Sequence, residues 1–516
     1  MAPARRLNFE RIMTTQSNRR RCSCGMAILV ILAVLFVPAA AAQEYRAFWV
    51  NANTDAFKTP ESVDRMVEDL ALARCNAIFM QVRSRATSFY RNSLEPFTED
   101  PAVPPGFDPL AYLIERAHRR GIEVHAWVPV TPFWNRDQPP KDPRHPWFLH
   151  GPQAIGDDMW MTVSNLGKTI AYVDPGNSGV IQYLADVIVD IPRHYNIDGI
   201  HLDYIRYPAG TGAAFDFGWN PGAVARFNRL TGSSGQPARN DAKFADFRRR
   251  QVTDLVRQIY LRTLAIRPSI KVSAALITWN DRGPVTRQDF SKTDGYIYCF
   301  QDWPKWLEEG IIDLGIPMSY FDETQHRAAL DSWIEFEKDH QYGRGILVGL
   351  GIYMNPIAGT REQIRRALAP SNAGNRLLGV DLFSYNFTNG GAAPVPNREF
   401  FQAAGNWFAN ATAVPELLWK TRPRTGHLYG WLQFREGPKW ANDTATIYLQ
   451  RASTREVRAI ATDATGFFGA VDLPPDSYRL GLKSGTWLTK FRRVDPGMAV
   501  LFNLLQTRLT RAEPRP

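Results

Sequence analysis

The feature that most constrains the fold of this 516-residue chain is an alternation, repeated eight times, of a short apolar run with an amphipathic helical segment. Runs rich in β-branched and aromatic residues occupy 46–50, 77–82, 123–128, 199–203, 272–277, 312–318, 346–352 and 380–385. Strands that alternate with helices pair in parallel through right-handed crossovers. Eight such units in succession predict an α/β fold of the (β/α)8 TIM-barrel type.

A doubly wound sheet is the alternative architecture for the same alternation. Its nucleotide-binding forms carry a Gly-rich phosphate turn after the first strand, and no such turn follows residues 46–50. The segments between the runs begin with helix signals, for example Thr59 as an N-cap with Pro60 at the first helical position. Further helices are expected near 177–192 and 241–266. We therefore prefer the barrel over residues 44–410.

Long loops rich in proline and aromatic residues follow four of the expected strands, at 86–107, 129–165, 205–222 and 278–301. In a (β/α)8 barrel, the loops after the strands lie at the C-terminal rim, where active sites form. The rim is therefore the place to search for functional side chains.

The pattern changes after the barrel. A Pro-containing linker is expected over 411–424, followed by short alternating strands over 425–500 and a tail over 501–516. Turn residues between short strands of period two predict a small all-β sandwich. Asp463, Gly466 and Phe468, with a later Leu-Pro element before Tyr478, resemble the carboxypeptidase-regulatory-like module. The resemblance is partial because Asp476 replaces a glycine, and it implies an accessory role.

The first 42 residues resemble a secretory signal peptide. Three arginines at 19–21 precede an apolar run over 26–37, and small residues follow at 38–42. The run is short for a membrane span, although an uncleaved anchor is the alternative. We expect a periplasmic or secreted protein. The two cysteines beyond this segment, Cys75 and Cys299, lie in apolar contexts and are expected to be free, buried thiols.

The net charge of +10 overstates how basic the folded part of the chain is. Six arginines and one glutamate in residues 1–42 account for +5, which leaves +5 for the remainder. The positive charge of that remainder is spread over the chain with no Lys/Arg tract, so nucleic acid is not an expected partner. No Cys/His spacing indicates a metal site, and no cofactor is implied.

Paired carboxyl groups at a barrel rim carry acid–base and nucleophilic chemistry, as in cleavage of glycosidic bonds. Asp203 ends the fourth run, and alternation places it on the same side as His201. Asp322 follows the sixth run, and Asp302 precedes the helix before it. These three aspartates are the catalytic candidates. A structural pair with Arg206 is the alternative for Asp203, and helix N-capping is the alternative for the other two.

Further rim positions carry side chains suited to binding a sugar polymer. Arginine can hold a carboxylate or the substrate, and aromatic faces suit the C–H surfaces of sugar rings. The substrate-binding candidates are Arg83, Arg85, Trp127, Trp134, His201, Tyr204, Arg206, Trp279, Tyr320 and Tyr353. Each of them alone is also explained by core packing or a structural ion pair.

Several segments together resemble the glycosyl-hydrolase-like family ten. They include DGIHLDYIRYP at 198–208 and QDWPKWLEEGIIDLGIPMSY at 301–320, in the family's order. The resemblance covers about 45–390 and implies an exported bacterial barrel hydrolase, with some members similar to peptidoglycan glycan-strand hydrolases. Many members carry a second aspartate where this chain has Tyr204, which leaves Asp203 alone on the fourth strand.

The sequence thus predicts hydrolysis of O-glycosidic bonds in a cell-envelope or extracellular polysaccharide. Asp203 is expected as nucleophile or stabiliser, with Asp322 or Asp302 as general acid. The polysaccharide is the expected partner, with association to the envelope through the C-terminal module. A non-catalytic glycan-binding protein and an envelope scaffold are the alternatives.

Overall fold

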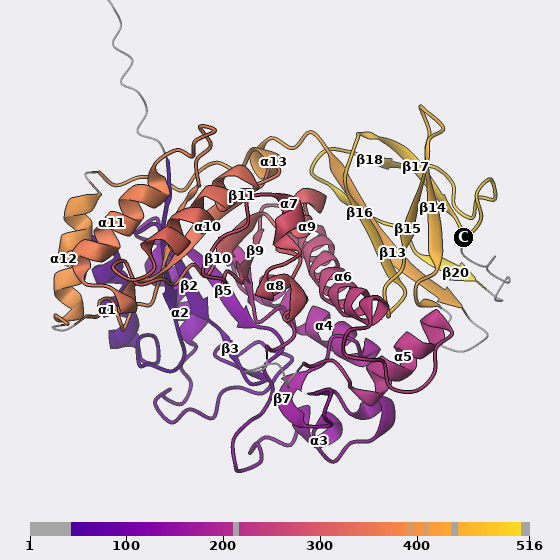
Figure 1. The fold of residues 1–516 in the computed structure, drawn as a ribbon, viewed down its shortest axis with the longest axis horizontal. Helices are drawn as coiled ribbons and strands as arrows, with labels where there is room; N and C mark the ends of the chain where they lie inside the picture. Colours follow the sequence, from indigo (N-terminus) through magenta and orange to yellow (C-terminus); the bar gives the residue numbers. More distant parts are fainter. Residues whose placement is uncertain (1–42, 210–215, 392–393, 409, 435–441, 507–516) are drawn as a thin grey trace, which may run out of the picture. The chain divides into compact units, whose positions relative to one another are not determined.

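The computed structural model describes residues 43–209, 216–391, 394–408, 410–434 and 442–506. The expected signal segment, 1–42, lies outside the described residues. Residues from Gln43 onward form one compact unit. Figure 1 shows the barrel strands surrounded by helices, with the C-terminal strands beside helix α6 (Ala242–Ile266).

Eight parallel strands close into a barrel in the order β1-β12-β11-β10-β9-β8-β5-β2. They are β1 (Tyr45–Val50), β2 (Ala77–Gln81), β5 (Glu123–Pro129), β8 (Gly199–Asp203), β9 (Lys271–Leu276), β10 (Leu314–Pro317), β11 (Gly345–Gly351) and β12 (Gly379–Phe383). Each coincides with one of the eight apolar runs. The predicted (β/α)8 fold is confirmed.

The side chains of β1 show how the barrel core is divided. Phe48 and Val50 face the helices, whereas Ala47 and Trp49 pack in the lumen against residues of other strands. Because side chains alternate along a strand, the last lumen-facing residue of each strand reaches the C-terminal rim. Whether a residue at the end of a strand faces the lumen or the helices therefore decides whether its side chain enters the site.

Helices cover the outside of the barrel. They are α1 (Pro60–Leu72), α2 (Pro109–His118), α4 (Ser178–His194), α6, α9 (Trp303–Glu309), α10 (Arg327–Asp339), α11 (Ile357–Leu368) and α12 (Asn397–Trp407). Thr59 caps α1 as predicted: its side chain accepts the backbone N–H of Ser62, whose hydroxyl accepts that of Thr59.

The rim loops contain short elements that the sequence pattern does not predict. Two hairpins, β3–β4 (Arg83–Ser84 and Thr87–Ser88) and β6–β7 (Met161–Val163 and Thr169–Val173), cross the rim. The loops also carry α3 (Trp147–His150), α5 (Pro221–Thr231), α7 (Arg287–Phe290), α8 (Asp294–Ile297) and the 3-10 turns Gly156–Asp158 and Ile352–Met354. These elements hold the loop side chains over the barrel.

The C-terminal part forms two facing sheets, as predicted. One contains β13 (Gly426–Phe434), β16 (Phe467–Leu473), β19 (Ala499–Leu501) and β20 (Leu504–Gln506), and the other β14 (Thr446–Arg451), β15 (Val457–Ala461), β17 (Asp476–Gly481) and β18 (Arg492–Val494). The strand pairs are antiparallel except that β13 pairs with β19 and β20 in parallel. Leucines and aromatic residues from both sheets form their own core.

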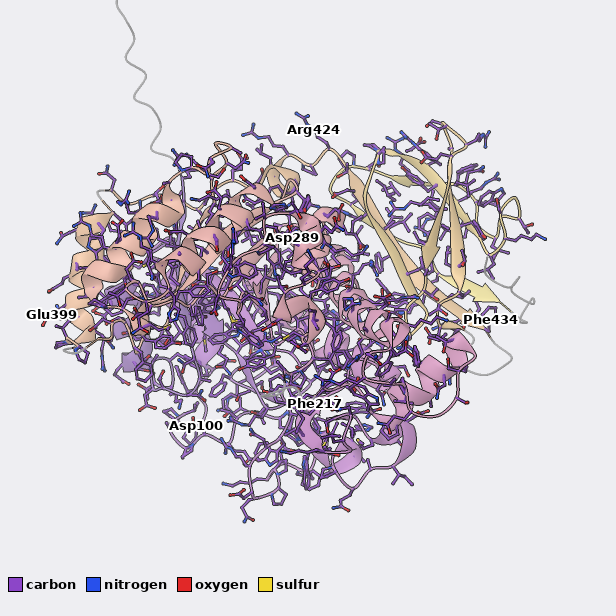
Figure 2. The ribbon with its side chains drawn as sticks, in the orientation of Figure 1. Asp100, Phe217, Asp289, Glu399, Arg424 and Phe434 are labelled. Atoms are coloured by element: carbon purple, nitrogen blue, oxygen red, sulfur yellow. The ribbon has the colours of Figure 1, made fainter. Side chains whose placement is uncertain are left out.

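This C-terminal part also packs on the barrel. Phe467 and Val471 of β16 belong to the same apolar core as the barrel helices. Arg226 of α5 forms a buried ion pair with Asp443, 2.5 Å apart. The expected linker 411–424 contains α13 (Leu418–Thr421), from which Trp419 donates to the buried carboxylate of Asp313. Arg424 lies on the connection to the C-terminal strands (Figure 2). The exact domain boundaries stay a prediction.

Cys75 and Cys299 are free and buried, as expected.

Candidate functional site

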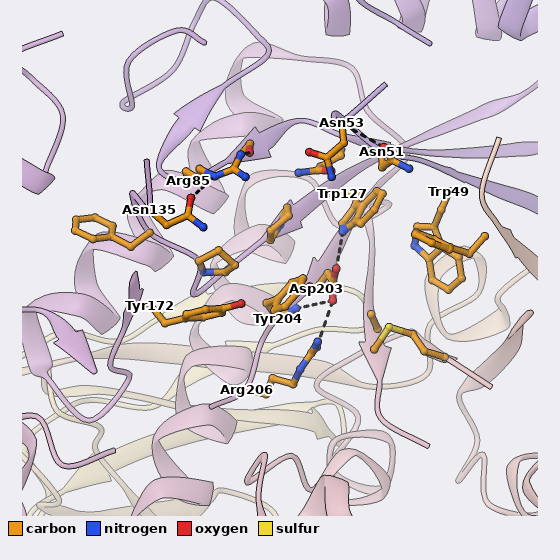
Figure 3. Close-up of a pocket in the computed structure, with 18 of the residues that line it drawn as sticks. Trp49, Asn51, Asn53, Arg85, Trp127, Asn135, Tyr172, Asp203, Tyr204 and Arg206 are labelled. Atoms are coloured by element: carbon orange, nitrogen blue, oxygen red, sulfur yellow. Dashed lines mark hydrogen bonds and ion pairs between the residues drawn. The ribbon is translucent and has the colours of Figure 1, made fainter. Parts of the chain in front are cut away.

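A pocket of about 340 Å³ opens at the C-terminal ends of the barrel strands (Figure 3). We call it the rim pocket. Its lining combines one carboxylate, two arginines, four amides and several aromatic rings: Asp203, Arg85, Arg206, Asn51, Asn53, Gln81, Asn135, Trp49, Trp127, Phe133, Tyr172, Tyr204, Tyr320 and Phe383. Six of these were candidates from the sequence, namely Arg85, Trp127, Asp203, Tyr204, Arg206 and Tyr320.

Asp203 ends β8 and its carboxylate is held by three donors. The indole Nε1 of Trp127 on the neighbouring strand donates to Oδ2 at 3.1 Å, and the backbone N–H of Tyr204 donates to Oδ1 at 2.6 Å. Arg206 Nη1 lies 3.3 Å from Oδ1. Figure 3 shows all three bonds meeting at the carboxylate. Since every partner is a donor and one is a cation, the arrangement suits the ionised carboxylate.

His201 lies below Asp203 and supports the pocket floor. Trp49 Nε1 donates to His201 Nε2 at 3.0 Å, so Nδ1 carries the ring proton and donates to Ser273 Oγ at 3.0 Å. Burial holds the pKa of His201 well below its usual value, with a smaller contribution from the charge of His125. His201 is fully buried and does not line the pocket. It is therefore not placed to contact a substrate in the rim pocket, and it supports Trp49 instead.

Aromatic rings form the walls of the rim pocket. The rings of Tyr172 and Tyr204 are 6.1 Å apart, and the guanidinium of Arg206 lies 4.4 Å from the Tyr204 ring centroid. On another side, Tyr320 stacks on Phe383 with 5.3 Å between centroids. Tyr204 has a φ of +51°, which directs the chain sharply away from β8 at the point where the carboxylate is presented.

The sequence reading missed the amides and Tyr172. Asn51 and Asn53 follow β1, Gln81 ends β2, and Asn135 lies in the long loop after β5. Amide groups donate and accept, as sugar hydroxyls do. A strand-end rule that included amides would have found Asn51 and Gln81. The loop residues Asn135 and Tyr172 carry no local signal of this kind.

The two proposed general acids lie elsewhere. Asp322 caps a turn ahead of α10, accepting from Thr324 Oγ1 at 2.6 Å and from the backbone N–H of Gln325 at 2.9 Å. These bonds, led by that from Thr324, lower the pKa of Asp322, which is opposite to what a general acid needs. Asp322 does not line the rim pocket, so its expected reach toward Asp203 is not seen.

Asp302 precedes α9 and pairs with Arg287 at 2.6 Å. Burial raises its pKa, the direction a general acid needs. However, Asp302 lines a different cavity, between α6, α9 and the C-terminal strand β15, so it is not placed to act with Asp203. Asp203 is the one carboxylate among the described residues of the rim pocket. Residues 210–215, outside the described part, contain no Asp or Glu in their sequence.

Arg83 is structural rather than substrate-binding. It is buried and forms a two-bond pair with Glu95, with Nε–Oε2 and Nη2–Oε1 distances of 2.8 Å. Tyr183 donates to the same carboxylate. Glu95 lies twelve residues after Arg83, so the pair is not apparent from the sequence around the strand end. Arg83 thus takes the alternative that the sequence left open.

Three aromatic candidates lie outside the rim pocket. Trp134 is buried beside a second cavity, described below. Trp279 is 47% exposed in the loop after β9. Tyr353 lines a neighbouring depression with Phe387 and packs edge-on to Tyr320. They could contact a long polymer only beyond the rim pocket.

A parallel eight-stranded barrel that presents a carboxylate and aromatic rings at its C-terminal rim has the architecture of the barrel enzymes, among which are many glycosidases. The comparison with protein families agrees with this class. Residues 44–363 match the family described as glycosyl hydrolase-like 10, and the chain belongs to that family.

Two curated relatives are similar to this chain. Glycosyl hydrolase YngK of Bacillus subtilis (strain 168) is 25% identical over 304 residues, which cover 56% of this chain and 54% of that protein. Glycosyl hydrolase DigH of Escherichia coli (strain K12) is 22% identical over 341 residues, covering 61% and 73%. The chain spans about half the length of the first of these relatives.

Among solved structures, the glycoside hydrolase domain of PgaB (BpsB) from Bordetella bronchiseptica is 14% identical with a TM-score of 0.49, covering 72% of this chain and 100% of that one. Alpha-L-fucosidase isoenzyme 2 from Paenibacillus thiaminolyticus is 14% identical with a TM-score of 0.47, covering 76% and 52%. These likenesses concern the fold, which rests on the strand order given above.

In the described part of the chain, no helix is long and apolar enough to cross a membrane. Within the same residues, no group of three or more His, Cys, Asp or Glu side chains is arranged to hold a metal ion.

Proposed function

We propose that this protein is an exported glycoside hydrolase that cleaves O-glycosidic bonds in a cell-envelope polysaccharide, and that peptide-free peptidoglycan glycan strands are among its substrates. The observation that carries the proposal is the Asp203 carboxylate, fixed by three donors inside an aromatic-walled pocket at the rim of a barrel of this family. Export rests on the signal-like residues 1–42.

In the proposed mechanism, Asp203 faces the anomeric carbon of a sugar bound between the rings of the rim pocket. The glycosidic C–O bond breaks through a transition state in which positive charge develops on the sugar ring. The leaving oxygen takes a proton from a water molecule, and the hydroxyl of that water completes the hydrolysis at the anomeric carbon. An ionised carboxylate stabilises that charge or attacks the carbon directly, and it needs no reorganisation because Trp127 and the Tyr204 backbone already fix it. The guanidinium of Arg206, 3.3 Å from Oδ1, holds the same carboxylate in place.

A specific observation favours a second function. Glycosidases of both stereochemical classes generally use two carboxyl groups, and the described lining of the rim pocket supplies one. A glycan-binding protein that retains the barrel pocket without cleaving its ligand would need no second group. In either case the lining comes from the barrel, which leaves the C-terminal sheets available for contact with the envelope.

The test is release of soluble fragments from purified, peptide-stripped glycan strands by the mature protein and three variants. Asp203→Asn is isosteric and should lower the rate about 1,000-fold, since it removes a charge that acts in the transition state. Asp322→Asn and Asp302→Asn are matched controls, because each removes a carboxylate outside the rim pocket. Both should retain the wild-type rate within about threefold.

Equal release by the wild type and Asp203→Asn would show that Asp203 is not essential for the cleavage. Loss of release in Asp302→Asn, with the thermal midpoint unchanged, would restore that residue as the general acid. No release by any protein, together with binding of the same strands, would establish the glycan-binding function in place of hydrolysis.

A further inference from the structure

A second cavity, of about 190 Å³, adjoins the rim pocket. We call it the side pocket. Asn53, Ser84 and Arg85 line both cavities, so Arg85 lies at the junction between them. The left-handed backbone of Arg85 and Ala86, with φ of +55° and +61°, turns the β3–β4 hairpin there. Figure 3 shows Arg85 and Arg206 on opposite sides of Asp203 in that view.

The charges that line the side pocket do not cancel. Lys58 is paired with Asp100 at 2.6 Å, so those two neutralise each other. Glu99, which accepts the backbone N–H of Lys141, is the other carboxylate of the lining. Two guanidinium groups, those of Arg85 and Arg136, also line the pocket. The lining therefore carries one more positive than negative charge.

Neither arginine has an ion pair within the described residues. Arg85 donates from Nε to Asn135 Oδ1 at 2.5 Å and from Nη1 to Ser84 Oγ at 3.1 Å, and both acceptors are neutral. Among the described residues, no side chain or backbone group accepts a hydrogen bond from its Nη2, which is therefore open to a ligand. Arg136 lies over the ring of Trp134, 5.3 Å from its centroid.

The positive charges of Arg85 and Arg136 repel each other. Partial burial lowers the pKa of Arg85, and the neighbouring charge of Arg136 lowers it further. An anion between them would relieve that repulsion. Arginine presents a planar fork of donors that matches a carboxylate in a bidentate pair. Arg83, two residues earlier, differs in that its guanidinium group already forms a two-bond pair with Glu95.

We propose that Arg85, assisted by Arg136, forms a subsite for the carboxylate of an acidic sugar, placed beside the sugar on which Asp203 acts. This rests on the proposed function for the glycan, and it adds the chemistry of one residue of that glycan. Two sources offer such a carboxylate: the lactyl ether of muramic acid and the C5 carboxylate of a uronic acid.

The test measures binding without cleavage. Full-length Asp203→Asn protein is titrated by calorimetry with tetrasaccharides from peptide-free glycan strands, and with the same tetrasaccharides after their carboxylates are coupled to methylamine. Amidation should raise Kd about tenfold or more, because it removes one charge-assisted pair. Adding Arg85→Gln should raise Kd similarly for the carboxylate ligand and leave Kd for the amide unchanged. A tetrasaccharide that alternates glucuronate with N-acetylglucosamine provides the uronate arm.

Arg282→Gln is the matched control, since Arg282 is exposed and lines neither pocket. Arg85-dependent binding of the muramyl or the uronate ligand supports the subsite and identifies the source. Equal Kd values for acid and amide, equal losses for both ligands in Arg85→Gln, or no binding of any ligand overturn it. Cleavage without discrimination between acid and amide would remove the subsite and keep the hydrolase. Arg85-dependent binding without cleavage by the wild type would keep the subsite and remove the hydrolase function.

Discussion

Glu337 of α10 is buried with a single neutral partner. Ser319, which follows β10, donates to its Oε1 at 2.8 Å, and no group in the described residues bonds to Oε2. Burial raises the pKa of Glu337 to about 8, opposed in part by the Ser319 bond and by Lys338. The carboxyl group of Glu337 is therefore protonated in the folded protein at neutral pH.

This carboxyl group should make stability depend on pH in a defined direction. The ordinary pKa of Glu is 4.5, so the folded state holds the proton over a range in which the unfolded state has lost it. Stability then falls as pH rises from about 5 to 8 and levels off above that. We expect Glu337→Gln to remove this fall, which amounts to about 3 kcal/mol between pH 6 and pH 9.

Urea unfolding of both proteins at pH 6 and pH 9 checks the prediction, since the other titrating groups contribute equally to each. The variant should gain on the wild type as pH rises. A parallel pH dependence in the two proteins would show that Glu337 ionises normally.

For single residues of the rim pocket, the sequence predicted those whose position depends only on the alternation of side chains along a strand. Asp203 and Trp127 lie at lumen-facing strand ends and were found from their positions. Tyr172 and Asn135 were missed, because they come from loops whose path depends on tertiary contacts. Asp322 was misplaced because an aspartate before a helix has the same sequence pattern whether it caps a turn or faces a cavity.

At the scale of elements, α5 is tied to the C-terminal part by the pair of Arg226 with Asp443. Arg226 Nε lies 2.5 Å from Oδ2 and Nη2 3.0 Å from Oδ1, and both side chains are at least 95% buried. Gln251 of α6 accepts from the same guanidinium at 2.6 Å. The pair thus joins α5, α6 and the segment before β14.

Breaking this pair should cost more than breaking an exposed one. Asp443→Asn leaves the Arg226 charge buried without its partner, and we expect the free energy of unfolding to fall by about 3 kcal/mol. Asp495→Asn is the control, because its pair with Arg493 is about half exposed and should contribute less than about 1 kcal/mol. Urea unfolding measures both changes. Equal losses in the two variants would contradict the structural role assigned to the buried pair.

Elements were predictable wherever apolar periodicity extended over a full strand or helix. All eight barrel strands were found from their apolar runs, since a strand buried on both faces needs such a run. The β6–β7 hairpin was missed because its strands are short and partly exposed, so that they share the composition of a loop. The pairing of β13 with β19 in parallel has no local signal at all.

At the scale of the whole molecule, the barrel and the C-terminal sheets share an apolar interface. Gly469 of β16 packs so closely on α6 that a Cβ atom there would lie 2.1 Å from Leu261 Cδ1. Arg250 donates to the backbone oxygen of Thr462 at 2.9 Å across the same contact, and Gln258 donates to Thr465 at 3.1 Å. The sequence predicted a linker and an accessory module. It carries no local signal for the contacts between α6 and the C-terminal strands, because these segments are far apart along the chain.

This interface predicts that the molecule unfolds as one unit. In scanning calorimetry the mature chain should give a single transition whose calorimetric and van't Hoff enthalpies agree. Gly469→Leu should lower the midpoint by several degrees, because overpacking at such a contact costs about 1–3 kcal/mol. Val457→Ala, on the exposed edge strand β15, is the control and should shift the midpoint little.

Deletion of 423–516 uncovers the face of α6 that Phe467 and Val471 contact, so the remaining barrel should be less stable or insoluble. Two separate transitions, with the first abolished by that deletion and the second unchanged, would instead establish an independent accessory module and a barrel that needs no cover.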